Sequence, residues 1–243
     1  MIYADDIDKA FDAISKAPAN LEQRLDLLKA LAEYFHGPIE PHDGIDAEQL
    51  KHLQLPFPLR WWFQLAGHRS SILNYQNELI EPDELKPDNK GKILFYVENQ
   101  GVYLWSTDSE GDDPPVWGRF QEPKLHFTKE GMSLSEFLIG VCLFEFMMQA
   151  PYGATASWLD QEELDRLRST IPELPLTPWR WPDNPSRFYG RRGASMFSCP
   201  NNGSDGSKAF SAWIGSTTPE PVSFLKDIVN DQWDSWTLDN EAP

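Results

Sequence analysis

Cysteine is scarce in this sequence, with only Cys142 and Cys199 among 243 residues. Cys142 lies within an apolar helical run, and Cys199 ends an expected strand. A disulfide-rich secreted scaffold needs more pairs than this. A domain of this length buries roughly 70–75% of the surface of its unfolded chain, so it needs no disulfide or metal to fold. We therefore expect two reduced, buried thiols in a cytosolic protein.

Basic residues are also few: 21 Lys and Arg stand against 38 Asp and Glu, for a formal net charge of −17. Such a charge repels nucleic-acid phosphates and favours fast encounter with a cationic partner. One basic and aromatic patch has the ingredients of a stacking platform for single-stranded nucleic acid. The same arginines can instead pack on aromatic rings or pair with carboxylates, which the overall charge favours. The patch consists of Arg187, Arg191, Arg192, Trp179, Trp181, Phe188 and Tyr189.

No long hydrophobic run is present. The most apolar segment, Leu134 to Met148, is too short to cross a bilayer and contains Glu136 and Glu145. The N-terminus has no basic region followed by an apolar one, so we expect no signal peptide. These observations predict a soluble cytoplasmic protein that does not bind membranes.

Signatures of catalysis, cofactor binding and metal binding are missing as well. The sequence contains no Gly-x-Ser-x-Gly elbow, no His-Glu-x-x-His pair and no kinase or dinucleotide motif. His36, His42, His52 and His68 are not spaced three or four residues apart on one helix. The segment Gly203–Lys208 has the wrong spacing for a phosphate loop and precedes a strand. We therefore expect no catalytic residue, no metal and no cofactor.

What the sequence does contain is a strand-rich segment from Lys92 to Trp117. Ile93–Val97 and Val102–Trp105 are rich in β-branched and aromatic residues, and Asn99–Gly101 between them has turn chemistry. The pair predicts an antiparallel hairpin. Because its apolar residues are nearly continuous, both faces should be covered, and the hairpin should lie in the middle of a sheet.

Other segments predict helices and a second hairpin. The expected helices begin near Asp5, Asn20, Asp46, Pro58, Ser133, Asp160 and Pro219. The helix after Ser133 is apolar around nearly its whole circumference, so it should be buried against the sheet. Ile171–Pro185 should form an extended layer with Trp179 and Trp181 packing inward, and Ala194–Cys199 should pair with Lys208–Ile214. One α+β domain over residues 1–243, with a mixed or antiparallel central sheet flanked by helices, fits this pattern.

One stretch carries a family resemblance. Leu55–Gly67 follows the pattern Leu-Pro-x-x-Leu-x-x-Trp-Phe-x-x-Ala-Gly, and a polar loop and the aromatic hairpin ending near Trp117 come after it. This order resembles the SUKH superfamily, which includes bacterial immunity proteins against polymorphic toxins and the yeast Smi/Knr cell-wall regulators. The family-like core would span about residues 53–148, with an aromatic-rich extension over 152–236 packed on it. Ser70–Leu85 departs from the pattern.

Four carboxylates follow the hairpin, at Asp108, Glu110, Asp112 and Asp113. A calcium loop needs Gly at its sixth position and Glu at its twelfth, and here these positions hold Asp113 and Arg119. Two interpretations stay open: a solvated loop, or an anionic loop that recognises basic side chains of a partner. The second makes Asp108, Glu110, Asp112, Asp113 and Trp117 the candidate partner-binding residues.

The resemblance implies a non-catalytic cytoplasmic immunity protein that binds a cognate toxin and blocks its active site or a neighbouring exosite. The acidic surplus indicates a toxin with a basic face, such as a nuclease. The alternative is a regulatory scaffold of the Smi/Knr kind that binds signalling partners. An enzyme is a third possibility, and no constellation of residues supports it.

Overall fold

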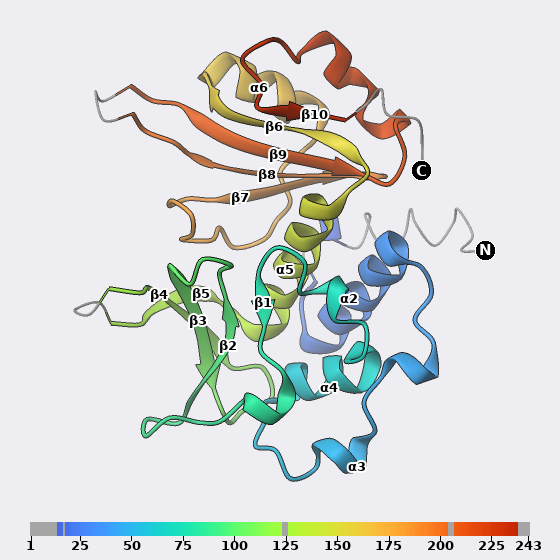
Figure 1. Cartoon of the computed structure of the whole chain (residues 1–243), viewed down its shortest axis with the longest axis vertical. Coiled ribbons are helices and arrows are strands. Elements are labelled where there is room, and N and C mark those ends of the chain that lie inside the picture. Colours follow the sequence, from blue (N-terminus) through green and yellow to red (C-terminus); the bar gives the residue numbers. More distant parts are fainter. Residues whose placement is uncertain (1–13, 17, 123–125, 204–206, 238–243) are drawn as a thin grey trace. The chain divides into compact units, whose positions relative to one another are not determined.

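The computed structural model describes residues 14–16, 18–122, 126–203 and 207–237. Within this part of the chain the fold is α+β, with two antiparallel sheets of five strands each (Figure 1). The α+β class and the antiparallel alternative are confirmed, and two sheets take the place of the one central sheet. The helix expected over Asp5–Ser15 falls almost entirely outside the described residues.

The chain divides into two compact units. Of the described residues, unit 1 holds 18–122 and 126–145, and unit 2 holds 14–16, 146–203 and 207–237. The boundary falls within one helix, between Glu145 and Phe146. A single domain over the whole chain stays a prediction.

Unit 1 combines short helices with the first sheet. Its α-helices are α2 (Leu21–His36), α3 (Ala47–Leu50), α4 (Phe57–Ala66) and the first part of α5 (Leu134–Gln149). Its 3-10 helices are η1 (Pro41–Asp43), η2 (Ser70–Ile72) and η3 (Pro82–Glu84). The strands are β1 (Glu78–Leu79), β2 (Lys92–Val97), β3 (Tyr103–Asp108), β4 (Pro115–Phe120) and β5 (Thr128–Ser133), and they lie in sequence order.

The predicted hairpin is confirmed as β2 and β3, which pair from Lys92 and Asp108 to Val97 and Leu104. Gly101 in the turn has φ 71°, a backbone conformation that glycine adopts without strain. β3 is the central strand, and every residue in it except Asp108 is buried. The hairpin therefore lies in the middle of its sheet, as expected.

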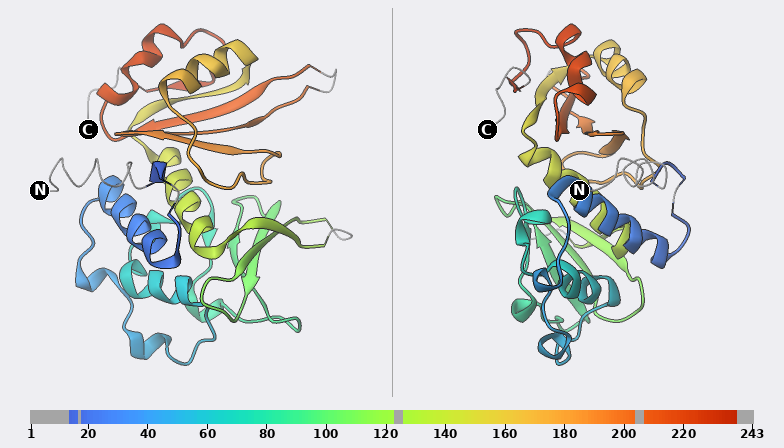
Figure 2. Two further views of the ribbon diagram at one scale, coloured as in Figure 1. Left: turned by 180° about the vertical axis from the view of Figure 1, so that it is seen from behind. Right: turned by 90° about the vertical axis from the view of Figure 1, so that its right-hand side faces the viewer.

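Helices α2, α4 and α5 lie together on one side of this sheet (Figures 1 and 2). α5 covers the sheet through Phe137, whose ring centroid is 5.5 Å from that of Phe95 and 5.6 Å from that of Trp105. From Leu134 to Met147 every residue of α5 except Glu136 is buried, as its apolar circumference predicted. The apolar face expected for α4 is also buried; it consists of Leu59, Trp62, Phe63 and Ala66.

A buried carboxylate joins α5 to the loop before β1. Glu145 is 0% exposed, and its oxygens accept hydrogen bonds from the backbone amides of Tyr75 at 2.8 Å, Gln76, and Asn77 at 3.1 Å. The Tyr96 hydroxyl donates a fourth bond to the same group. Burial raises the pKa of the Glu145 carboxyl above its usual range, and the four donors act against that shift. The loop, β2 and α5 are thus joined at one point.

Unit 2 contains the second sheet. Its elements are the end of α5, β6 (Tyr152–Leu159), α6 (Gln161–Thr170), β7 (Arg187–Arg191), β8 (Ala194–Pro200), β9 (Phe210–Ser216), the 3-10 helix η4 (Glu220–Asp227) and β10 (Ser235–Trp236). The strand order is β10-β6-β9-β8-β7, and β8 with β9 is the predicted second hairpin. The last helix, expected near Pro219, is this 3-10 helix.

The two faces of the second sheet are built differently. α6 and η4 lie on one face (Figure 2). Leu167 of α6 and Val222 and Leu225 of η4 belong to the core of unit 2. On the other, Phe188, Phe197 and Trp213 are direct cross-strand neighbours on β7, β8 and β9. Trp179 continues this aromatic row, with its ring centroid 5.1 Å from that of Phe188, and it is buried as predicted. Trp181, also expected to pack inward, is half-buried.

Both cysteines are free and buried, as expected. Burial raises the pKa of Cys199 to about 12 and that of Cys142 still higher, so both thiols are protonated at neutral pH. In the described residues no helix combines the length and the apolar character needed to span a bilayer.

The end of α2 is fixed by Arg69, whose guanidinium donates to the backbone carbonyls of His36 and, at 2.7 Å, Pro38. The His36 imidazole lies largely buried near this cation. Burial, and then the charge of Arg69, lower the pKa of His36 from 6.5 to about 4.

We expect Glu145→Gln to lower the free energy of unfolding by about 3 kcal/mol. The substitution replaces one carboxylate oxygen by an NH2 group, so two of the buried donors lose their acceptor. Urea denaturation of the variant and the wild type measures this difference. Glu162→Gln, at an exposed position of α6, is the control and should change stability by less than about 0.5 kcal/mol. Equal stability of the two variants would contradict the role given to Glu145.

Stability should also depend on pH through His36. The pKa of His36 is lower in the folded state than in the unfolded state. The contribution of this residue to the free energy of unfolding is therefore fully present above the unfolded-state pKa of 6.5, and it is lost as the pH falls toward 4. The loss amounts to up to about 3 kcal/mol. His36→Gln should remove this part of the pH dependence, measured by urea denaturation between about pH 7 and 4. His52→Gln, at an exposed position, should retain it; parallel curves for wild type and His36→Gln would refute the assignment.

Candidate functional site

The acidic loop, defined here as Asp108–Asp113, joins β3 to β4 and contains four of the five predicted partner-binding residues. The structure divides its carboxylates into two groups. Asp108 and Asp113, at the two ends, bond to other parts of unit 1, whereas Glu110 and Asp112 are exposed.

Asp108 lies beside Trp117, the fifth predicted residue, with a lysine between them. The Lys92 ammonium is 2.5 Å from the Asp108 carboxylate and 3.8 Å from the centroid of the Trp117 ring. Lys92 pairs with Asp108 across β2 and β3, and Trp117 pairs with Ser106 across β3 and β4. The cation thus neutralises Asp108 and covers the half-buried indole.

Asp113 is directed toward the start of α5. Its carboxylate accepts hydrogen bonds from the Ser135 amide at 2.9 Å and the Ser135 hydroxyl at 2.7 Å, and forms an ion pair with Arg24 at 3.2 Å. A carboxylate at this position satisfies an amide of the first helical turn and complements the helix dipole. Asp113 therefore connects α2, α5 and the loop.

The middle of the loop is held as well. The Ser109 amide donates to the Gly91 carbonyl at 2.9 Å, and Ser109 is buried. Gln54 reaches Glu110 only at 3.5 Å, the long limit for a hydrogen bond. The charge that the loop offers to solvent is thus carried by Glu110 and Asp112.

The sheet face next to the loop is the one turned away from α5. Trp105 packs on Phe137 of α5, so its neighbours Leu104 and Ser106 point to the opposite face, where Trp117 and Arg119 are their cross-strand partners. Leu94 and Val97 of β2 lie on this face and are half-buried. A half-exposed tryptophan, aliphatic side chains and a charged border are typical of protein-binding surfaces.

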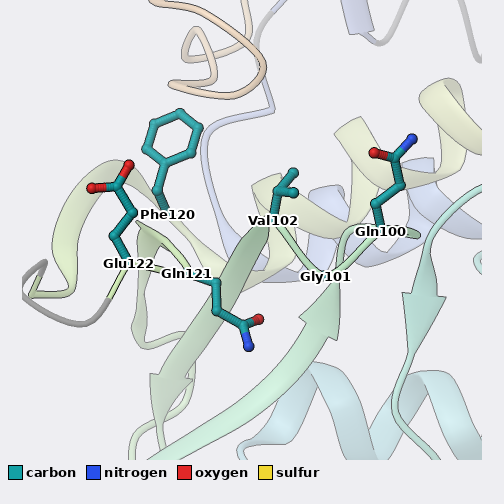
Figure 3. A pocket seen from close by; sticks show the side chains of 6 residues that line it. All are labelled: Gln100, Gly101, Val102, Phe120, Gln121 and Glu122. Atoms are coloured by element: carbon teal, nitrogen blue, oxygen red, sulfur yellow. The ribbon is translucent and has the colours of Figure 1, made fainter.

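Three apolar side chains are exposed at the opposite end of this sheet, which the sequence analysis did not single out. Tyr75, Val102 and Phe120 are 56%, 46% and 41% exposed. The Asn99 amide donates to the Asn77 side chain at 3.2 Å, which joins the loop of Tyr75 to the β2–β3 turn. A cavity of about 410 Å³ opens between that turn and the end of β4 (Figure 3). Its lining residues are Gln100, Gly101, Val102, Phe120, Gln121 and Glu122.

Buried carboxylates often mark active sites, and Glu98, Glu130 and Glu145 are three of those in the described part of unit 1. Glu145 bonds to the loop before β1, as described. Glu98 accepts from the amides of Gln100 at 3.0 Å and Val102 at 3.1 Å, and Glu130 accepts from the Tyr103 hydroxyl at 2.7 Å. All three therefore serve as internal acceptors that fix loops and strands.

Other chemistry-bearing residues do not converge. In the described part of the chain, no group of three or more His, Cys, Asp or Glu residues is arranged to hold a metal ion. In the basic and aromatic patch, Arg187 pairs with Glu173 and the Arg191 guanidinium lies 5.9 Å from the Phe224 ring. Phe188 and Tyr189 are buried, so this geometry matches arginines paired with carboxylates and packed on rings.

The division of the loop is testable by removing one carboxylate at a time. Asp113→Ala should lower the free energy of unfolding by about 2 kcal/mol, because the first turn of α5 loses an acceptor and Arg24 loses its partner. Asp112→Ala, one residue away and exposed, is the matched control and should stay within about 0.5 kcal/mol of wild type. Urea denaturation gives both values; equal losses would show that Asp113 has no special structural role.

Comparisons with family models, curated proteins and solved structures found no match to this chain. The resemblance to the SUKH superfamily thus stays a prediction.

Proposed function

We propose that this chain is a non-catalytic cytoplasmic binding protein that neutralises a cognate toxin domain with a basic face, such as a nuclease. The observation that carries the proposal is the acidic loop, which is held at Asp108, Ser109 and Asp113 and leaves Glu110 and Asp112 exposed.

Rigidity of the loop favours binding, because a loop that is already ordered loses little conformational entropy when a partner binds it. A stable complex buries on the order of 1,600 Å² in total, centred on a few apolar anchors with a charged rim. The outer sheet face supplies such a centre in Trp117, Leu94 and Val97, and the acidic loop supplies one side of the rim. The net charge of −17 accelerates encounter with a cationic toxin.

The test is a rescue of toxicity in a bacterial host. The C-terminal domain of the protein encoded immediately upstream of this chain is expressed alone, and then together with this protein. We expect the domain alone to kill the host, and co-expression to restore growth and give a stable complex. A neighbour that is harmless, or that kills regardless, would contradict the immunity function and favour the regulatory scaffold.

The loop is tested in the same assay with the double variant Glu110→Lys, Asp112→Lys. We expect it to lose protection and to bind the toxin at least ten times more weakly, since two attractive charges become repulsive. Asp83→Lys, Glu84→Lys is the matched control: it makes the same change in charge at two exposed residues of η3 and should protect like wild type. Full protection by the loop variant would exclude the loop from the interface.

A further inference from the structure

The cavity at the β2–β3 turn combines an apolar wall with polar acceptors. Val102 and Phe120 form its apolar part, and of the six described residues that line it Glu122 alone is charged. In Figure 3 the side chains of Phe120 and Glu122 lie near each other and point to the same side, as expected for residues two apart in extended backbone. Val102 and Gln100 point to that side too, whereas Gln121 points away.

The walls of this cavity are fixed from within. The Glu98 carboxylate holds the amides of Gln100 and Val102, and the Gln121 amide donates to the Val102 carbonyl at 2.8 Å. The Phe120 ring meets the Tyr103 ring edge-on, with the centroids 4.8 Å apart. The cavity is therefore preformed, and a ligand would not have to order it.

We propose that this cavity binds an arginine side chain of a basic protein partner. The methylene stem of arginine would lie on Val102, and its planar guanidinium would lie against the Phe120 ring and pair with the Glu122 carboxylate. The Gln100 carboxamide oxygen offers a further acceptor. Arginine suits this set better than lysine, because the guanidinium is planar, stacks on aromatic rings and is more weakly hydrated.

Charge argues for this occupant and against others. Glu122 disfavours an anionic ligand, and a second copy of this chain would also carry a net charge of −17. A basic protein partner would be repelled neither by Glu122 nor by the net charge of this chain.

The inference rests on the proposed function for the source of the arginine. The cavity lies at the Tyr103 end of β3 and the acidic loop at the Asp108 end, so the two are separated by about 17 Å at roughly 3.4 Å per residue. An interface of ordinary size, about 800 Å² on each side, is wide enough to span that distance along the strand.

The test uses a model peptide in place of the toxin. Acetyl-Gly-Arg-Gly-amide is titrated into the ¹⁵N-labelled full chain, and the amide shifts of Gly101, Val102 and Gln121 are followed. We expect saturation with a dissociation constant in the millimolar range, and at least fivefold weaker binding of the isosteric citrulline peptide. Equal binding of the two peptides, or no shifts at these residues at about 20 mM peptide, would overturn the proposal.

Two variants locate the site. Glu122→Gln is conservative and exposed, and it should weaken binding of the arginine peptide at least fivefold; Phe120→Ala should do the same. Glu84→Gln removes an equal charge at an exposed residue of η3 and should leave binding unchanged. Unaltered binding by Glu122→Gln, or an equal loss with Glu84→Gln, would refute a specific site in favour of non-specific attraction to an acidic protein.

The outcomes of the two experiments are independent. Peptide binding at the cavity with a failed toxin rescue would leave the cavity assigned and remove the immunity function. Rescue without peptide binding would support the immunity function and remove the assignment of the cavity.

Discussion

The buried carboxylate of Glu145 joins three parts of unit 1 that are far apart in the sequence: α5, the middle of the sheet and the loop before β1. Burying a carboxylate costs several kcal/mol unless hydrogen-bond donors replace its lost water. Three consecutive backbone amides and the Tyr96 hydroxyl meet that need. Because those amides lie in the loop that leads into β1, this one side chain adds to the strand pairing that holds β1 beside β2.

Acidic residues have a repeated structural use in unit 1. Glu98 fixes the β2–β3 turn, Glu130 accepts from Tyr103, and Asp113 bonds to the first turn of α5. Close packing accompanies this use: a Cβ atom on Gly118 would lie 1.8 Å from Glu130 Oε1, so a larger residue there would displace the Glu130 or Tyr103 side chain. A net charge of −17 therefore overstates the charge available for recognition, since some carboxylates are occupied within the fold.

Local patterns in the sequence predicted the elements well. Asn20 and Asp160 cap the helices expected to begin at them, by accepting bonds from the Gln23 and Glu163 amides, and Gly37 ends α2 with φ 83°. These features depend on residues within four positions of one another, so the sequence alone contains what is needed.

Hydrogen bonds between residues far apart in the sequence were not predicted. The bond from Asp113 to Ser135 spans 22 positions, and those from Glu145 to the loop before β1 span about 70. The acidic cluster consequently looked uniform, although two of its members are structural. One signal was available for Glu145: an acidic residue between Phe144 and Phe146, on a helix apolar all around, has to find donors inside the protein.

The acidic loop and the cavity at the two ends of β3 suit different steps of binding one basic partner. Exposed carboxylates such as Glu110 and Asp112 act at a distance, so they raise the association rate, and salt weakens their effect. A side chain held between Phe120 and Glu122 acts only on contact, so it slows dissociation. Because Glu98 holds the cavity and Asp113 holds the loop, both are already formed in the free protein. Net charge alone attracts every basic protein. Attraction by the acidic loop followed by slow release from the cavity would therefore allow a strongly acidic protein to discriminate among basic partners.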